Sequence, residues 1–237
     1  MIPKTIHYCW FGRGEKSKLI KRCIASWKRV CPDYEIIEWN EDNYDISKAD
    51  FMKRAYEAKN WAYVTDYARL DIVYEHGGIY LDTDVELIKP FDFLLKYAGF
   101  AGFEDSERVN TGVGFGAEKG NGIVGKMLAE YEGQDYLRAD NTLNEACPIK
   151  NTRAAVSSGF RADGTFQTVN SFVLLPKDYF CPLENSTGVL TKTENTVAVH
   201  WFDKSWIDKK TKLRSKITRP FHRLFGEDCF ERFKGKK

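Results

Sequence analysis

The sequence predicts an α/β fold: a Rossmann-like sheet with helices on both faces, followed by a basic, helical tail at the C-terminus. The 237 residues are 43% apolar, which is enough for a globular domain with a sizeable core. Short strand-like segments alternate along the chain with longer segments of helical period. Residues 209–237 hold eleven lysines and arginines against three acids, a charge of +8 that leaves −6 for the rest. We therefore expect a domain at 1–208 and a tail at 209–237.

The first elements are a strand at 3–9, a helix and a second strand in YEIIEWN. In SKLIKRCIASWKRVCPDY the apolar residues recur every three or four positions, with Ser17 as a plausible cap and Pro32 as a stop. A strand, a helix and a strand in this order are the usual start of a nucleotide-binding sheet. No GxGxxG follows the first strand, so the sequence does not support a dinucleotide site.

The next strong helix lies in NWAYVTDYARLDIVYEHGG and ends at its glycine pair. Asp66 and Arg69 lie three apart and share a face of this helix, where a surface ion pair is an equally good interpretation. The segment GIYLDTDVELI then predicts a strand at 79–88. Residues two apart in a strand point the same way, so Asp82 and Asp84 should converge.

The pattern is less regular after this strand. The segment 110–122 holds five glycines, which predicts tight turns or a backbone that approaches a ligand. IVGKMLAEYEG predicts a helix, and ACPIKNTRAAV another with Pro148 in its first turn. SFVLLPKDYFCPL predicts a strand followed by a loop, and 196–206 predicts a last strand with a polar, aromatic end.

The acidic pair suggests a divalent cation site. Mn²⁺ or Mg²⁺ prefers oxygen ligands and keeps open positions for water and phosphate. A solvated surface turn is the alternative, but the pair lies between the apolar segments GIYL and VELI. An aspartyl phosphatase also places D-x-D after a strand. That class expects Thr or Val as the fifth residue, near the start of the chain, whereas this motif has Glu86 and lies a third of the way along.

The segment TDYARLDIVYEHGGIYLDTDVELIKP resembles the signature of glycosyltransferase family 32, the DXD sugar-binding group that includes capsular polysaccharide transferases and fungal α-mannosyltransferases. IPKTIHYCWFG, ACPIKNT and YFCPL…TENTVAVHWFDKSW agree in the family's order, so the resemblance spans residues 2–206. It implies a GT-A fold with a nucleotide-sugar-binding sheet. It also implies a retaining, metal-dependent transfer of sugar from a nucleotide diphosphate sugar, with UDP-sugar favoured. One departure is Cys147, where the family often has glycine before Pro148, on the acceptor side.

The resemblance also implies roles for individual residues. Asp82 would contact the ribose and reach the Mn²⁺ or Mg²⁺ through water, Asp84 would chelate the metal directly, and His200 would be a late ligand. The donor-binding residues would be His7, Trp10 on the nucleobase, Asp66 and Arg69 on the donor sugar, Tyr80, and Ser205 and Trp206 on the diphosphate. Asn110, from the glycine-rich segment, is our candidate on the acceptor side. No carboxylate need lie under the anomeric carbon, so attack from the same face as the leaving group is favoured.

Two other functions stay open: a non-catalytic nucleotide-sugar-binding module, and a nucleotidyltransferase, for which GRGEKSK is a faint match. The acceptor expected from the resemblance is a glycan or lipid-linked oligosaccharide in surface polysaccharide synthesis, such as capsule or lipopolysaccharide.

The expected location is the cytoplasm, on the inner face of the cytoplasmic membrane. No apolar segment is long enough to cross a membrane, no secretory leader is visible, and six cysteines without CxxC spacing indicate reduced thiols. Apolar residues at 213, 217, 221 and 224 form a stripe with basic flanks, which suits an anionic membrane surface. A tail helix that packs on the domain is the alternative, and Pro220 predicts a kink or break. Nucleic acid is a poorer partner because the rest of the chain is acidic.

Overall fold

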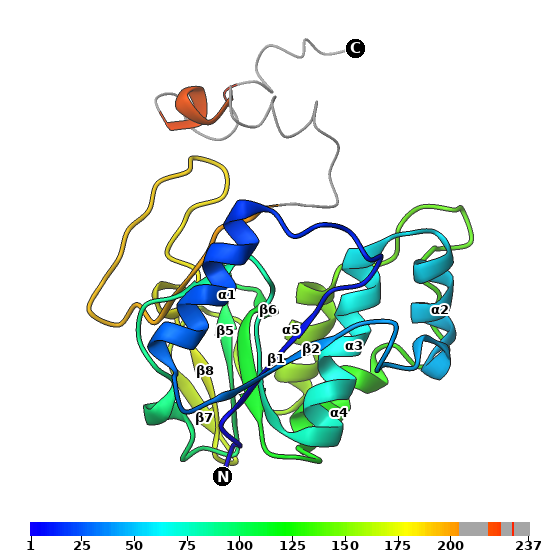
Figure 1. The fold of residues 1–237 in the computed structure, drawn as a ribbon, viewed down its shortest axis with the longest axis horizontal. Coiled ribbons are helices and arrows are strands. Elements are labelled where there is room, and N and C mark those ends of the chain that lie inside the picture. The colour runs from blue at the N-terminus through cyan, green and yellow to red at the C-terminus, as the bar shows by residue number, and fades with distance from the viewer. Residues whose placement is uncertain (204–217, 224–228, 230–237) are drawn as a thin grey trace.

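The structure, a computed structural model, describes residues 1–203, 218–223 and 229. A seven-stranded mixed sheet in the order β2-β1-β3-β6-β5-β8-β7 forms its centre, and a two-stranded sheet joins β4 to β9 (Figure 1). The strands of the large sheet are β1 (Thr5–Cys9), β2 (Glu35–Trp39), β3 (Gly78–Tyr80), β5 (Gly99–Phe103), β6 (Val109–Ala117), β7 (Gln167–Val169) and β8 (Phe172–Leu175). The α/β prediction is confirmed.

The predicted start of the fold is also confirmed. Strand β1 lies parallel to both β2 and β3, and α1 (Lys18–Val30) connects the first two strands. The side chain of Ser17 caps α1 by accepting a hydrogen bond from the Ile20 backbone N–H at 3.3 Å. Trp27 of α1 is fully buried against one face of the sheet, and its indole N–H donates to the Val85 carbonyl at 2.7 Å.

Four helices cover the other face of the sheet: α2 (Asp50–Glu57), α3 (Trp61–His76), α4 (Gly122–Ala129) and α5 (Cys147–Ser157). Helices therefore lie on both faces, as Figure 1 shows with α1 on the opposite side from the others. Helix α3 packs against both α2 and α4, and its central turns are buried. It ends at Gly77, whose φ of 70° suits a residue without a Cβ.

The prediction of one strand at 79–88 is wrong. The chain forms β3, turns at the acidic pair, and continues as β4 (Val85–Leu87) in the small sheet. The backbone N–H of Val85 donates to the Asp82 carbonyl at 3.0 Å, which closes the turn. The hydroxyl of Ser26 on α1 accepts a hydrogen bond from the Leu87 N–H at 2.9 Å. Partners outside the segment thus hold β4 away from the large sheet.

The glycine-rich segment was expected to form tight turns or to bring its backbone close to a ligand. Most of it forms a buried strand and not turns. Strand β6 lies between β3 and β5, and all nine of its residues are buried. Its glycines make room for neighbouring side chains: a Cβ on Gly116 would lie 2.8 Å from the Phe100 ring. The last expected strand is also shorter than predicted, because β9 covers only Ala198–His200.

The described residues of the tail, 218–223, are helical. The Arg223 guanidinium donates to the Thr187 carbonyl at 3.1 Å, so this part of the tail touches the domain. Ser205, Trp206 and most of the tail lie outside the described residues. None of the described helices has the length and apolar character needed to cross a bilayer. The six cysteines are all free thiols.

Candidate functional site

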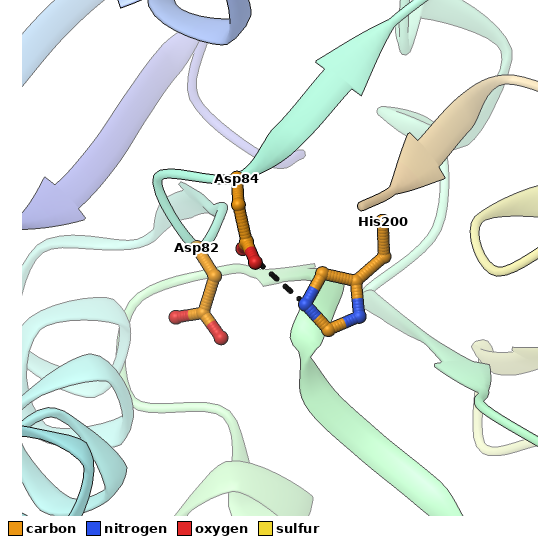
Figure 2. A group of neighbouring side chains, drawn as sticks. All are labelled: Asp82, Asp84 and His200. Carbon is orange, nitrogen blue, oxygen red and sulfur yellow. Dashed lines mark ion pairs between the residues drawn. The ribbon is translucent and has the colours of Figure 1, made fainter. Parts of the chain in front are cut away.

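The acidic pair lies where β3 ends at the edge of the large sheet. The backbone N–H of Asp82 donates to the Gly112 carbonyl of β6 at 3.1 Å, which fixes the start of the turn. The Tyr80 hydroxyl donates to Asp82 Oδ1 at 3.2 Å. The side chains of Asp82 and Asp84 turn into the same space (Figure 2). They converge because of the turn, and not because they share a strand face.

The small sheet brings His200 to the acidic pair. Val85 of β4 pairs with His200 of β9 in antiparallel register. This register sets the imidazole Nε2 3.3 Å from Asp84 Oδ1 (Figure 2). Possible ligand atoms of Asp82, Asp84 and His200 all lie within 4.8 Å of one another. The expected approach of His200 to the two acids is therefore observed.

Charge interactions bind this group together. Burial alone lowers the pKa of His200, but the Asp84 carboxylate outweighs it, so the net pKa lies well above its ordinary value. Burial raises the pKa of Asp84, but His200 and the backbone N–H of Asp203, which donates to Asp84 Oδ2 at 2.7 Å, more than reverse this. A proton shared by this pair occupies the place that a divalent cation would take.

The donor atoms can hold a divalent cation. The two carboxylates suit Mn²⁺ and Mg²⁺, and the imidazole suits Mn²⁺ better than Mg²⁺. The side chains of Asp84 and His200 are 14% and 10% exposed, whereas that of Asp82 is 28% exposed. The site is thus closed on the His200 side and open beside Asp82, where water and phosphate oxygens could complete the coordination.

Arg69 is the buried cation of the site. Its Nη2 lies 3.1 Å from Asp82 Oδ1 and 3.3 Å from Asp66 Oδ1, and its side chain is 4% exposed. One turn earlier, the Thr65 carbonyl and hydroxyl accept from the same guanidinium at 2.9 and 3.0 Å. Burial raises the pKa of Asp66 to about 6, although the positive charge of Arg69 lowers it in part. A surface ion pair is therefore the wrong interpretation of these two residues, which position each other inside the site.

A buried polar network continues behind Arg69. Its Nη1 lies 3.9 Å from the Cys147 thiol, which in turn lies 3.7 Å from Asn110 Oδ1. Asn110 Oδ1 also accepts from the Gly112 N–H at 2.7 Å. A Cβ on Gly112 would lie 2.3 Å from Asp82 Oδ2 and 2.6 Å from Arg69 Nη1. Gly112 thus makes room for the Arg69–Asp82 pair, and Cys147, the departure from the family pattern, lies within hydrogen-bonding reach of both Asn110 and Arg69.

Trp10 lies away from this group, at the end of β1. It lines an open cavity of about 410 Å³ that also includes Arg13, Lys16 and Glu38. The Trp10 indole N–H donates to the Gly14 carbonyl at 2.7 Å, and the Lys16 ammonium lies 5.2 Å from the ring centroid. The ring is half-buried. It therefore combines a fixed orientation with an exposed face.

The structure places His7 in the core instead of the donor site. It is 2% exposed, and its Nε2 lies 2.9 Å from the Gly77 carbonyl. The Trp39 indole N–H donates to His7 Nδ1 at 3.1 Å, so Nε2 carries the proton and donates to Gly77. Burial lowers the pKa of His7 to about 4. Both nitrogens are used within the protein, and we leave His7 out of the donor site.

Several site residues escaped prediction from the sequence. Thr65, Gly112 and Asp203 each contact a predicted residue but were not predicted themselves, although Thr65 and Asp203 lie within segments that carry the resemblance. The glycine of NTG could have been suspected, since a glycine inside a strand often marks a close approach. The backbone contact of Asp203 carries no sequence signal.

Comparison with known proteins shows similarity to glycosyltransferases. Residues 17–101 match the family described as "Glycosyltransferase sugar-binding region containing DXD motif". The chain is 26% identical over 233 residues to subversion of eukaryotic traffic protein A of Legionella pneumophila, covering 84% of this chain and 34% of that protein. It is 32% identical over 103 residues to inositol phosphoceramide mannosyltransferase 3 of Schizosaccharomyces pombe, covering 40% and 28%. The chain thus spans about a third of the length of the curated relatives it matches.

Among solved structures, the chain resembles the PaToxG glycosyltransferase, with a TM-score of 0.53 and 20% identity over 66% of this chain and 68% of that one. At this identity the likeness concerns the fold, which is of the GT-A type. The match of residues 17–101 adds the sequence of the sugar-binding region. Residues 17–101 thus match the sugar-binding region of the DXD-containing glycosyltransferases, the group that the sequence resembles, and the fold agrees with this match.

Proposed function

We propose that this protein is a metal-dependent, retaining glycosyltransferase that moves a sugar from a nucleotide diphosphate sugar, with UDP-sugar favoured, to a glycan or lipid-linked oligosaccharide. One observation carries the proposal: Asp82, Asp84 and His200 converge within 4.8 Å beside the buried Arg69–Asp66 pair. A cation bound there would neutralise the diphosphate as it departs. Two curated relatives are named inositol phosphoceramide mannosyltransferases, which supports transfer of a sugar to a lipid-bearing acceptor.

The chain's own residues have separate tasks in this proposal. Asp84 and His200 would hold the cation, and Asp82 would reach it through water and contact the donor ribose. Arg69 and Asp66 hold the hydroxyls of the donor sugar, because Arg69 is already fixed by Thr65 and needs no reorganisation. Tyr80 keeps Asp82 oriented through its hydroxyl. The acceptor oxygen approaches from the same face as the departing diphosphate, which retains the anomeric configuration.

A panel of nucleotide sugars tests the proposal. The protein is mixed with Mn²⁺ and each donor in turn, and free nucleoside diphosphate is measured with and without a glycan acceptor. We expect Mn²⁺-dependent hydrolysis or transfer with at least one donor. Donor binding without turnover would instead indicate a sugar-binding module. Pyrophosphate release from a nucleoside triphosphate and a sugar phosphate would indicate a nucleotidyltransferase.

Replacing Trp10 tests the assignment of the nucleobase. We expect Trp10→Ala to weaken binding of the free nucleoside diphosphate by ~1–3 kcal/mol, the usual contribution of one stacked base. Titration calorimetry measures the change, and Trp10→Phe, which keeps an aromatic face, should recover most of the affinity. Unchanged affinity together with a large fall in melting temperature would mean that Trp10 serves the core.

We also propose that the basic tail holds the protein at an anionic membrane surface, in line with a lipid-linked acceptor. Each lysine or arginine near such a surface contributes ~1 kcal/mol, and residues 209–237 carry a charge of +8. Co-sedimentation with vesicles compares the full chain with a version that ends at Asp208. We expect binding to anionic vesicles that falls at high salt and is lost on truncation. Equal sedimentation of both proteins, or indifference to lipid charge, would contradict an electrostatic anchor.

A further inference from the structure

A second cavity, of about 330 Å³, lies beside the candidate site and has no role in holding the donor or the metal as proposed above. It is enclosed by the turn between β5 and β6, by the segment 183–186, by Phe202 after β9, and by two residues of the tail helix, Thr218 and His222. Four separate parts of the chain therefore build its walls.

Two contacts connect this cavity to the metal site. The Phe202 ring packs on the His200 imidazole, with the ring centroids 4.1 Å apart. On another wall, the Glu104 carboxylate accepts a hydrogen bond from Asn110 Nδ2 at 2.7 Å. The other end of the Asn110 amide binds the Gly112 N–H, next to Asp82. A molecule in the cavity would thus lie one side chain away from the cation and from the donor-binding residues.

The lining is polar and carries more negative than positive charge. Glu104, Asp105 and Glu184 contribute carboxylates. The Arg108 guanidinium contacts the first two at 3.6 and 2.5 Å, and the Lys177 ammonium, which is not in the lining, contacts Glu184 at 2.9 Å. Asn185 also lines the cavity, and its buried Oδ1 has no hydrogen-bond partner in the described parts of the chain. This oxygen and the Glu104 carboxylate can each accept a hydrogen bond from a hydroxyl group of a ligand.

Phe202 adds an apolar surface to this polar lining. Its φ of 51° lies in the left-handed region, which is unusual for an aromatic residue and is found where surrounding contacts enforce it. A hydrogen bond from the Asp203 N–H to Asp84 Oδ2 fixes the backbone conformation after β9. The result is a ring held against both the cavity and His200. An aromatic ring of this kind packs well against the C–H face of a sugar.

We propose that this cavity is the acceptor subsite and takes an uncharged sugar at the end of a glycan, with Glu104 accepting a hydrogen bond from one of its hydroxyls. This inference rests on the proposed transferase function and adds the class of acceptor. A sugar offers one hydroxyl for Glu104 and another for Asn185 Oδ1, whereas a serine, threonine or tyrosine of a protein offers one. The three carboxylates outnumber the two cations that contact them, Arg108 and Lys177, and would disfavour a uronic acid or a sugar phosphate.

Saturation-transfer NMR tests the cavity without relying on turnover. The full chain, with the diamagnetic Mg²⁺ and UDP, is mixed with the methyl glycosides of glucose, galactose and mannose, and separately with methyl glucuronide and glucose 6-phosphate. We expect at least one uncharged glycoside to bind and the two charged sugars not to bind. Glu104→Gln keeps an acceptor for Asn110 but loses the charge, and should weaken glycoside binding ~10-fold or more.

Glu107→Gln is the matched control, because Glu107 lies on the same turn, is exposed and does not line the cavity. It should bind the glycosides as the unmodified chain does. The inference would be overturned if no glycoside bound, if the charged sugars bound equally well, or if Glu104→Gln bound the glycosides as tightly as the unmodified chain. Transfer of labelled sugar to a protein hydroxyl, with none to a glycoside, would do the same.

Donor hydrolysis without acceptor separates the two proposals. It needs the donor and metal residues and no ligand in the cavity. Hydrolysis without any glycoside binding would overturn the acceptor subsite and leave the transferase proposal intact. Glycoside binding without hydrolysis or transfer from any donor would overturn the transferase proposal and leave the sugar-binding cavity.

Discussion

Asp84→Ala should reduce sugar transfer at least ~100-fold and abolish its dependence on Mn²⁺, while the protein stays folded. The reason is that Asp84 is the carboxylate closest to His200 and, in our proposal, the direct ligand of the cation that neutralises the departing diphosphate. Steady-state kinetics with the donor found in the panel, together with thermal unfolding, measures both effects.

Glu86→Gln is the control for this variant. Glu86 lies two residues further along β4, but its carboxylate contacts Arg22 at 3.2 Å and the Trp201 indole at 2.9 Å. Glutamine can still accept both hydrogen bonds, so transfer should stay within about twofold of the unmodified protein. An Asp84→Ala protein that turns over at a similar rate to this control would remove Asp84 from the metal site.

Arg69→Ala should have the largest effect on stability. It removes the buried cation between Asp66 and Asp82 and leaves two carboxylates without their partner. Breaking a buried pair in this way costs ~3–5 kcal/mol of the free energy of unfolding, in contrast to an exposed pair. Chemical denaturation at pH 7.5 measures the loss, and no transfer activity should survive.

The loss from Arg69→Ala should depend on pH. The Asp66 pKa is already raised to about 6, and without Arg69 it would rise further. A carboxylate whose pKa is raised on folding lowers stability most above its folded pKa; this penalty shrinks as pH falls below the folded pKa and is gone below the unfolded pKa. The deficit of Arg69→Ala should therefore shrink between pH 8 and pH 5, and adding Asp66→Asn should restore part of the stability. A deficit that is constant with pH would mean lost packing instead of unpaired charge.

The parts of the fold that the sequence predicted are those set by local chemistry. Helix α3 has a clear apolar period and a glycine pair that ends it, and α1 has a serine cap. The break between β3 and β4 could not be predicted, because LDTDV contains no glycine or proline and both flanks are apolar. It depends on α1 and β9, which hold β4 from outside the segment.

The same distinction applies to the site. Spacing alone predicted that Asp66 lies close to Arg69 and Asp82 close to Asp84, although a turn and not a shared strand face brings the two acids together. His200 was placed by resemblance to a family. Its position depends on the register of β4 against β9, a long-range pairing that no local pattern encodes. The opposite happened with His7. The segment that contains it resembles the family, but its ring is buried and hydrogen-bonded to Trp39 and Gly77. Burial decided its role, and burial is a property of the whole fold.

Pulsed electron paramagnetic resonance of Mn²⁺ bound to the full chain in the presence of UDP tests the central claim most directly. The account predicts nitrogen modulation of the Mn²⁺ signal, because the His200 imidazole would be a ligand together with Asp84. That modulation should vanish in His200→Ala and persist in His76→Ala, which alters an imidazole stacked on Trp39 in another part of the fold. Bound Mn²⁺ without nitrogen modulation, or with modulation unaltered in His200→Ala, would contradict the metal site.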